Sequence, residues 1–350
     1  MKSSFKKDDV ILLLKDITGL VEPLPTKERE LLIQGGKHYC EMLPLEYRPS
    51  QDYVRIYNRA LEVFSKDTAL AVSRLGQMLY QKHGDKLVIV SLARAGIPIG
   101  ILLKRYIRNK YNVEVAHYSI SIIRGRGIDN NAMKYILARH DAADIQFVDG
   151  WVGKGAIYKE LKKELNNYPG VSDELAVLSD PAGVTSLCGT YKDFLIPSSC
   201  LNSTVSGLIS RTFLRDDIIG ENDFHGAAYY GELNAEDRTY EFIDRIESQF
   251  QYDIDTELDD THVRNGYEEV LEIKEHFKIR DINFIKPGIG ETTRVLLRRV
   301  PWKVLLDKNH LDDPQLEHIV QLAKEKNVPV ESYSLKNYKC CGIISDMGDI

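Results

Sequence analysis

The sequence predicts an α/β protein in which a parallel-sheet domain is followed by a small α/β/α sandwich. Short apolar segments rich in β-forming residues alternate with longer segments of helical periodicity, as in a doubly wound parallel sheet. Small and polar residues follow several of the apolar segments, where open α/β sheets bind ligands. An acidic stretch then separates this pattern from a second, shorter alternation of helices and strands. The predicted domains cover residues 1–255 and 264–350.

Composition narrows the class of protein. A chain of 350 residues is long enough for two domains with their own cores, and a net charge of −6 argues against a protein that coats nucleic acid. No apolar run approaches the roughly 20 residues that span a bilayer, and the first residues lack the apolar core of a signal peptide. Five irregularly spaced cysteines and nine scattered histidines predict neither a disulfide framework nor a zinc site. We therefore expect a cytoplasmic protein with no membrane partner, and the sequence leaves its oligomeric state open.

The first 50 residues are irregular, because prolines interrupt their helical patterns. Within them, His38, Cys40, Glu41 and Glu46 lie among apolar residues. This segment is interpreted as an N-terminal arm packed on the body of the protein, and a loop that closes over a site is the alternative. Residues 51–84 then predict one or two amphipathic helices.

The next apolar segment, residues 87–91, predicts a buried strand that leads into a turn containing Arg94, and a helix to about Arg108. Residues 112–123 alternate like a strand, and residues 124–131 form a polar, glycine-rich loop. Arg124 and Arg126 on this loop are candidates for phosphate contact, since guanidinium groups bind phosphate bidentately. Solvated surface arginines are the alternative.

The stretch from Asp144 to Leu165 combines a strand, an acid, a glycine-rich turn and a helix. Residues 145–148 predict a buried strand that ends at Asp149, and residues 156–165 predict a helix. Successive N–H groups and the positive end of a helix dipole make such a turn an anion site. The glycine spacing fits neither a Walker A loop nor a dinucleotide-binding fingerprint. A turn that serves only packing is the alternative.

Two of these segments resemble those of type I phosphoribosyltransferases. Residues 88–100 are similar to the pyrophosphate loop of that family, and residues 147–157 to its loop for phosphoribosyl pyrophosphate (PRPP). Gly150, Lys154 and Ile157 stand where the family pattern has an acid and two threonines. The resemblance implies a PRPP-dependent glycosyltransferase that uses Mg²⁺ and acts on a phosphorylated ribose or a nucleotide. It implies catalytic roles for Asp149, which would also bind the metal, and Arg94, with phosphate contacts from Ala95, Gly96, Gly153, Lys154, Gly155 and Ala156.

A closer resemblance covers nearly the whole chain. Residues 35–46, 149–157 and 196–211 are similar to segments of phosphoribosyltransferase-like proteins of tellurite-resistance and stress operons, which are labelled the StiP family of cysteine proteases. This resemblance implies an enzyme of a stress-associated biosynthetic system. Two alternatives to a transferase stay open: a nucleotide or PRPP sensor without turnover, because the second loop acid is missing, and the cysteine protease of the label.

Residues 175–179 predict a further strand, and residues 188–211 are rich in Ser, Thr, Asn and Cys. We interpret this region as a wall of the acceptor pocket, with Asp180, Cys200, Asn202 and Arg211 as candidate residues. A protease would instead require Cys188 or Cys200 as nucleophile and His38 or His225 as base. No basic residue flanks either cysteine, which favours buried cysteines without a catalytic role.

Acidic residues between positions 249 and 263 predict a linker, and the second domain is predicted to begin at Arg264. Its pattern predicts helices over 267–277, 291–299 and 314–326, and strands over 283–285, 302–306 and 328–333. Residues 288–294 resemble the RNA-contacting loop of the pelota and kink-turn ribosomal-protein fold. The resemblance implies that this domain binds structured RNA, and a charged solvent-exposed helix is the alternative. The candidate RNA contacts are Lys286, Gly288, Glu291, Thr293 and Arg294.

Overall fold

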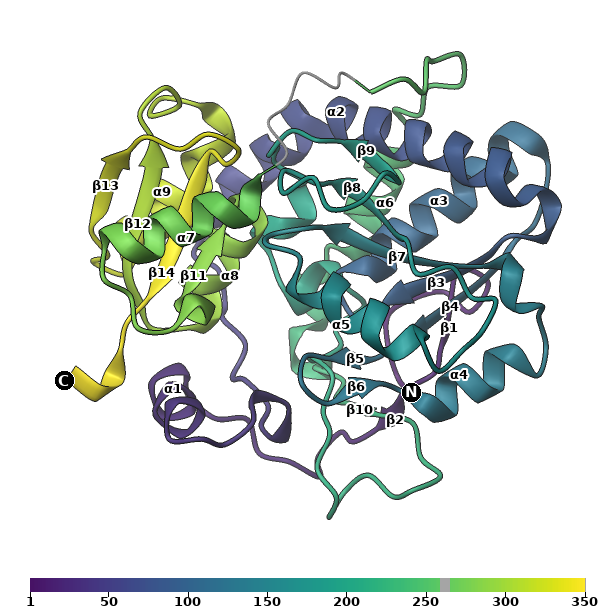
Figure 1. Cartoon of the computed structure of the whole chain (residues 1–350), viewed down its shortest axis with the longest axis horizontal. Helices are drawn as coiled ribbons and strands as arrows, with labels where there is room; N and C mark the ends of the chain where they lie inside the picture. Colours follow the sequence, from purple (N-terminus) through teal and green to yellow (C-terminus); the bar gives the residue numbers. More distant parts are fainter. Residues whose placement is uncertain (259–264, 350) are drawn as a thin grey trace.

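The computed structural model of this chain describes residues 1–258 and 265–349 (Figure 1). Its larger part is built on a six-stranded sheet in the order β1-β4-β3-β7-β8-β9, in which each adjacent pair is parallel. The predicted α/β class with a parallel-sheet core is therefore confirmed. The strands are β1 (Ile11–Leu12), β3 (Val88–Leu92), β4 (Ala116–Ile120), β7 (Ile145–Trp151), β8 (Leu175–Ser179) and β9 (Cys188–Thr190).

Helices cover both faces of this sheet, as the near-continuous apolar strands require. On β3, Ile89 faces the cluster that contains residues of α2, α3 and α6, whereas Val88 and Val90 face the cluster of α4 and α5. This alternation follows from the two-residue period of a strand. The helices are α2 (Gln51–His83), α3 (Gly96–Tyr111), α4 (Asn130–Leu137), α5 (Ala156–Leu165) and α6 (Thr239–Glu247). Among the described residues, no helix combines the length and the apolar character needed to cross a membrane.

Two predicted segments near the carboxyl ends of the strands differ from the structure in their bounds or type. The strand predicted to end at Asp149 continues to Trp151, because β7 pairs with β8 at Asp149 and again at Trp151. The predicted loop of residues 124–131 is the turn of a hairpin between β5 (Ile122–Ile123) and β6 (Gly127–Ile128), and it ends at the start of α4. The helix predicted over 156–165 has the same bounds as α5.

The N-terminal segment reaches from the parallel-sheet domain to the C-terminal domain, as Figure 1 shows for α1 (Thr26–Gln34). Near its start, β2 (Lys15–Asp16) pairs with β10 (Gly226–Ala227). At its far end, the side chain of Gln34 donates to the carbonyl oxygen of Ser345 at 2.9 Å. A 3₁₀ turn, η1 (Tyr39–Glu41), then brings the chain back beside the hairpin of β5 and β6. Other 3₁₀ turns include η4 (Pro197–Cys200), η5 (Ser203–Val205) and η7 (Ile282–Phe284).

The C-terminal domain is a four-stranded sheet in the order β11-β14-β12-β13 with three helices. The sequence analysis missed β14, a central strand that pairs antiparallel with both β11 and β12. The predicted linker and the predicted domain start at Arg264 fall partly on residues 259–264, outside the described residues. The elements are α7 (Gly266–His276), β11 (Ile285–Pro287), α8 (Ile289–Arg298), β12 (Pro301–Asp307), α9 (Glu317–Glu325), β13 (Val330–Tyr333) and β14 (Cys340–Ile344).

Candidate active site and interdomain cavity

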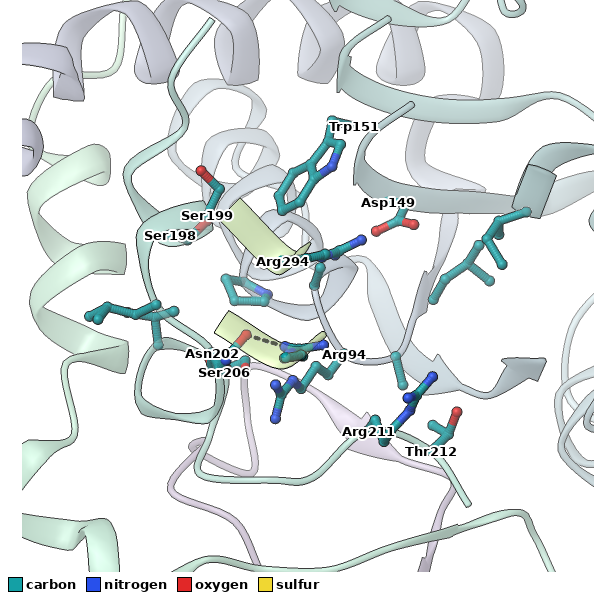
Figure 2. Close-up of a pocket in the computed structure, with 18 of the residues that line it drawn as sticks. Arg94, Asp149, Trp151, Ser198, Ser199, Asn202, Ser206, Arg211, Thr212 and Arg294 are labelled. Atoms are coloured by element: carbon teal, nitrogen blue, oxygen red, sulfur yellow. Dashed lines mark hydrogen bonds between the residues drawn. The ribbon is translucent and has the colours of Figure 1, made fainter. Parts of the chain in front are cut away.

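Two adjoining cavities of about 180 and 260 Å³ lie between the carboxyl ends of β3 and β7 and helix α8 of the C-terminal domain. They share Tyr39, Asp149, Trp151, Arg211 and Arg294 in their walls, and we refer to them together as the interdomain cavity. Figure 2 shows Asp149, Trp151, Arg94, Arg211 and Arg294 around this space. The cavity therefore lies where open α/β sheets bind ligands, with the second domain closing one side.

The interdomain cavity brings together two sets of residues that the sequence analysis assigned to different ligands. The candidate phosphate and acceptor residues come from the parallel-sheet domain, and the candidate RNA contacts come from the C-terminal domain. The two sets face each other across one space, so the predicted RNA-contacting loop turns toward the other domain. The predicted residues that line the cavity are Arg94, Ala95, Arg124, Asp149, Gly153, Lys154, Gly155, Ala156, Asn202, Arg211, Lys286, Glu291 and Arg294.

Six other predicted site residues have local structural roles instead. Gly96 allows close packing, because a Cβ there would lie 2.7 Å from the carbonyl oxygen of Val148. Asp180 accepts hydrogen bonds from three backbone N–H groups of its own turn at 2.7 to 3.0 Å. Thr293 is buried and its hydroxyl lies 2.8 Å from the carbonyl oxygen of Ile289. Arg126 pairs with Glu41 at 2.8 Å, Gly288 begins α8, and Cys200 is buried at the end of η4.

Lys154 joins the glycine-rich turn to the C-terminal domain. Its side chain is buried, and its ammonium group donates to the carbonyl oxygen of Ile285 at 3.0 Å and to that of Ile282. Burial lowers the pKa of Lys154 to about 7, and the neighbouring Lys286 adds to the effect. The hydroxyl of Tyr338 also donates to the carbonyl oxygen of Gly153 at 2.8 Å. The ammonium group of Lys154 therefore forms its hydrogen bonds with the second domain in this structure.

Asp149 lies in β7 at the wall of the cavity. Burial raises the pKa of its carboxyl group to about 6, while Arg294 acts in the opposite direction. In the described part of the chain, no group of three or more His, Cys, Asp or Glu side chains could hold a metal ion. The charged groups around Asp149 are mainly cationic, and such surroundings do not suit a divalent cation. No finding tests the Mg²⁺ assignment itself, which stays a prediction.

Cys40 and His38 form a thiol–imidazole pair beside this cavity. The sulfur of Cys40 lies 2.9 Å from Nδ1 of His38, and Nε2 of His38 lies 3.1 Å from the carbonyl oxygen of Arg124. Because a carbonyl oxygen can only accept, Nε2 carries the ring proton, and Nδ1 presents its lone pair to the Cys40 thiol and to the Cys40 backbone N–H, which lies at 3.4 Å. Tyr39, which lies between the two residues in the sequence, lines the cavity. The guanidinium of Arg211 lies over its ring, 4.2 Å from the ring centroid.

Burial sets the protonation state of this pair. Cys40 is 0% exposed, and burial raises the pKa of its thiol to about 11. Burial also lowers the pKa of His38. The resting pair is therefore a neutral thiol against a neutral imidazole, with the imidazole oriented as a base.

The sequence analysis named His38 as a candidate base but did not name Cys40 as its nucleophile. Cys200 is buried, and burial raises the pKa of its thiol far above the usual range. Nδ1 of His225 lies 2.9 Å from the hydroxyl oxygen of Ser121. The signal that could have found the pair is the spacing His38-x-Cys40 itself, in a segment already singled out.

Comparisons with known proteins agree with the StiP resemblance. Residues 3–247 match the family described as "Tellurite-like stress resistance cysteine protease StiP", and residues 264–346 match the PELOTA RNA binding domain. A protein of Acinetobacter baylyi named "Cysteine protease StiP" is 37% identical over 366 aligned residues. The alignment covers 99% of this chain and 94% of that relative.

These matches correct the enzyme class. The prediction of a PRPP-dependent phosphoribosyltransferase, and with it of a glycosyltransferase, is wrong, because both the family and the full-length relative are described as cysteine proteases. The matches do not support a phosphoribosyltransferase-like classification of the first domain either. The geometry is in keeping with this correction, since Lys154 of the supposed PRPP loop is bonded to the C-terminal domain. The stress-resistance family and the pelota-type domain are confirmed.

Proposed function

This chain belongs to the StiP family of tellurite-like stress resistance cysteine proteases, and from that premise we propose that it is a cysteine-dependent peptide hydrolase with Cys40 as nucleophile and His38 as base. One observation carries the assignment: the 2.9 Å separation between the Cys40 sulfur and Nδ1 of His38, with Nε2 held by the carbonyl oxygen of Arg124. Peptide hydrolysis by a thiol requires a nucleophile, a base and a group that orients the base.

The proposed reaction uses this pair in two steps. The Cys40 sulfur attacks the carbonyl carbon of the peptide bond while its proton passes to Nδ1 of His38. His38 then gives that proton to the departing amine, which leaves an acyl group bound to sulfur as a thioester. Water, deprotonated by His38, attacks the thioester, releases the acid and restores the thiol.

Substrate access requires a shift of the segment that carries Cys40. In the resting structure the hydroxyl of Tyr39 accepts from the backbone N–H of Arg124 at 2.9 Å, and the Cys40 carbonyl accepts from the N–H of Leu214 at 3.0 Å. Glu41 pairs with Arg126 at 2.8 Å. These contacts hold η1 against its neighbours and bury the thiol, so we expect substrate to bind as η1 moves outward.

Peptide hydrolysis by the full chain tests the proposal. Cys40→Ser is expected to lower the rate by at least ~10³-fold, because removal of a nucleophile takes away the covalent step. His38→Asn is expected to lower it strongly as well. Cys200→Ser is the matched control: it changes another buried cysteine and is expected to keep the activity of the parent. Circular dichroism of each variant checks that the fold is retained.

The assay separates the competing assignments. Activity that survives in folded Cys40→Ser would rule out Cys40 as nucleophile. Activity that disappears in folded Cys200→Ser would move the assignment to Cys200. Mass spectrometry after iodoacetamide treatment identifies which cysteine is alkylated when activity is lost.

We also propose that the C-terminal domain binds RNA, which the match to the PELOTA RNA binding domain supports. Glu291 and Arg294, two of the predicted contacts, line the interdomain cavity. RNA that uses this loop would therefore compete with the other domain for the same face. A mobility-shift comparison of the full chain with residues 265–350 tests this competition.

A further inference from the structure

We propose that the interdomain cavity is a binding site for a phosphate-bearing small molecule, held by arginines from both domains. Arg94 and Arg211 come from the parallel-sheet domain, and Arg294 and Arg298 come from α8. The proposal concerns a site distinct from the Cys40–His38 pair, and neither depends on the other. The carrying observation is an excess of guanidinium groups around the cavity, two of which have a buried nitrogen without a hydrogen-bond partner.

The lining of the cavity is strongly cationic. Six arginines and two lysines line it, against two acids, Asp149 and Glu291. Several of these cations have partners elsewhere: Arg299 donates to both oxygens of Glu30 at 2.5 and 2.7 Å, and Arg124 donates to Asn283 at 2.6 Å. The four arginines that line the smaller cavity are less well compensated, and we call them the central arginines: Arg94, Arg211, Arg294 and Arg298.

Two of the central arginines have unused donors. Arg94 is 7% exposed. Its Nη1 donates to Glu46 at 3.2 Å and to the carbonyl oxygen of Ile209 at 2.6 Å, while its Nη2 has no partner. Arg298 donates to the amide oxygen of Asn202, and its Nε has no partner. A buried donor without a hydrogen-bond partner is costly, so such donors indicate a ligand that completes their hydrogen bonds.

The other two central arginines are held in place by aromatic rings. The guanidinium of Arg211 lies 4.2 Å from the ring centroid of Tyr39, and that of Arg294 lies 4.4 Å from that of Trp151. Such contacts fix the guanidinium planes before a ligand arrives. Arg294 also pairs with Glu291 at 2.5 Å, whereas among the described residues no carboxylate forms an ion pair with Arg211.

The positive charges of these arginines also oppose one another. Burial lowers the pKa of Arg298 far below its usual range, and the neighbouring charge of Arg94 lowers it further. Burial likewise lowers the pKa of Arg211 to about 10. A phosphate group carries two negative charges and several acceptor oxygens, and it matches the planar fork of a guanidinium. It would therefore relieve the repulsion and satisfy the open donors together.

Calorimetric titration of the full chain with inorganic phosphate and with pyrophosphate tests the proposal. We expect binding to the parent, and a loss of about 10- to 100-fold in affinity for each of Arg211→Gln and Arg298→Gln, one from each domain. Arg55→Gln is the matched control, because the Arg55 side chain is 73% exposed and lies away from the cavity. It is expected to bind phosphate like the parent, as is Cys40→Ser.

A second measurement separates loss of ligand from loss of fold. The melting temperature of ligand-free Arg298→Gln is measured first, and a cooperative transition shows that the variant folds. Phosphate is expected to raise the melting temperature of the parent, and this rise is expected to be lost in Arg298→Gln. Equal phosphate affinity in the parent and both cavity variants would overturn the proposal. Tighter binding of citrate than of phosphate would also overturn it.

Discussion

At the scale of single residues, burial decides what the charged groups of this protein do. Lys154 and Asp149 belong to the same strand–turn segment and were predicted to bind the same ligand. Burial lowers the pKa of Lys154 to about 7 and raises that of Asp149 to about 6, because it disfavours the charged form of each group. The difference lies in their partners: Lys154 contacts the C-terminal domain and Asp149 faces the cavity.

Lys154 gives a prediction about stability and pH. The unfolded chain keeps this lysine protonated up to about pH 10.5, whereas the folded chain loses the proton near pH 7. The unfolded state therefore binds more protons between these values, so stability rises as pH increases from 7 toward 10.5. The contribution between pH 7 and 9 is of the order of 1–3 kcal/mol.

Urea unfolding at pH 7 and 9 measures this effect. Lys154→Met is expected to remove most of the rise, whatever its stability at a single pH. Lys163→Met is the control, since the Lys163 side chain is 71% exposed, and it is expected to keep the rise seen in the parent. The same pH dependence in Lys154→Met and in the parent would show that Lys154 does not titrate in this range.

At the scale of elements, the contact between β7 and α8 positions both sides of the cavity. Trp151 at the end of β7 packs against Gly290 in the first turn of α8, and the guanidinium of Arg294 lies over the same indole ring. A Cβ at Gly290 would lie 2.2 Å from the Trp151 ring. Glycine is needed here because the helix backbone approaches an aromatic side chain closely.

Gly290→Ala is expected to destabilise the protein by about 1–3 kcal/mol, because the added methyl group overlaps the indole ring. In a helix without that contact the same substitution would stabilise by roughly 0.5–1 kcal/mol, so the sign of the change is decisive. Gly150→Ala is the control, since its Cβ would meet no atom closer than 3.8 Å. Chemical denaturation compares the variants, and a stability gain in Gly290→Ala would contradict the close packing of α8 on β7.

At the scale of the whole molecule, the two sheets are joined by buried polar contacts and by a continuous apolar cluster. Asp193 of the parallel-sheet domain accepts from the backbone N–H of Ile289 at 3.0 Å and from that of Lys339 at 2.8 Å. One apolar cluster includes Val148 and Leu178 of the first domain and Leu296 and Leu306 of the second. The C-terminal domain also has an apolar cluster of its own, which includes Ile285 and Ile343.

When the two segments are expressed separately, we expect the first to be less stable than the full chain and the second to bind RNA more tightly than the full chain. Residues 1–258 alone lose the partners of Asp193 and Lys154, so their melting temperature is expected to fall by at least about 5 °C below that of the full chain. Residues 265–350 alone are expected to fold and to bind structured RNA more tightly than the full chain, because the α8 face is uncovered. Differential scanning calorimetry and mobility-shift assays measure the two effects. RNA affinity equal in segment and full chain would show that the first domain does not cover the RNA-binding face.

The sequence by itself determined the α/β class, the four inner strands of the parallel sheet and the bounds of α5, because apolar periodicity and β-forming residues act over a few neighbouring positions. It missed β14, whose short run Cys-Cys-Gly-Ile-Ile shows no alternation and becomes a central strand only through pairing with β11 and β12. Most of the site residues that it proposed do line the cavity, since small and charged residues follow the strand ends.

Only the tertiary structure decided how these residues are combined. Arg94 and Arg298 are some 200 positions apart in the chain, and nothing local to either indicates that they line the same cavity. The orientation of the His38 ring depends on the carbonyl oxygen of Arg124, which a hairpin brings beside the N-terminal segment. The role of Lys154 depends on carbonyl groups of the other domain. Partners so far apart in sequence are selected by packing of the whole chain, which short-range patterns do not record.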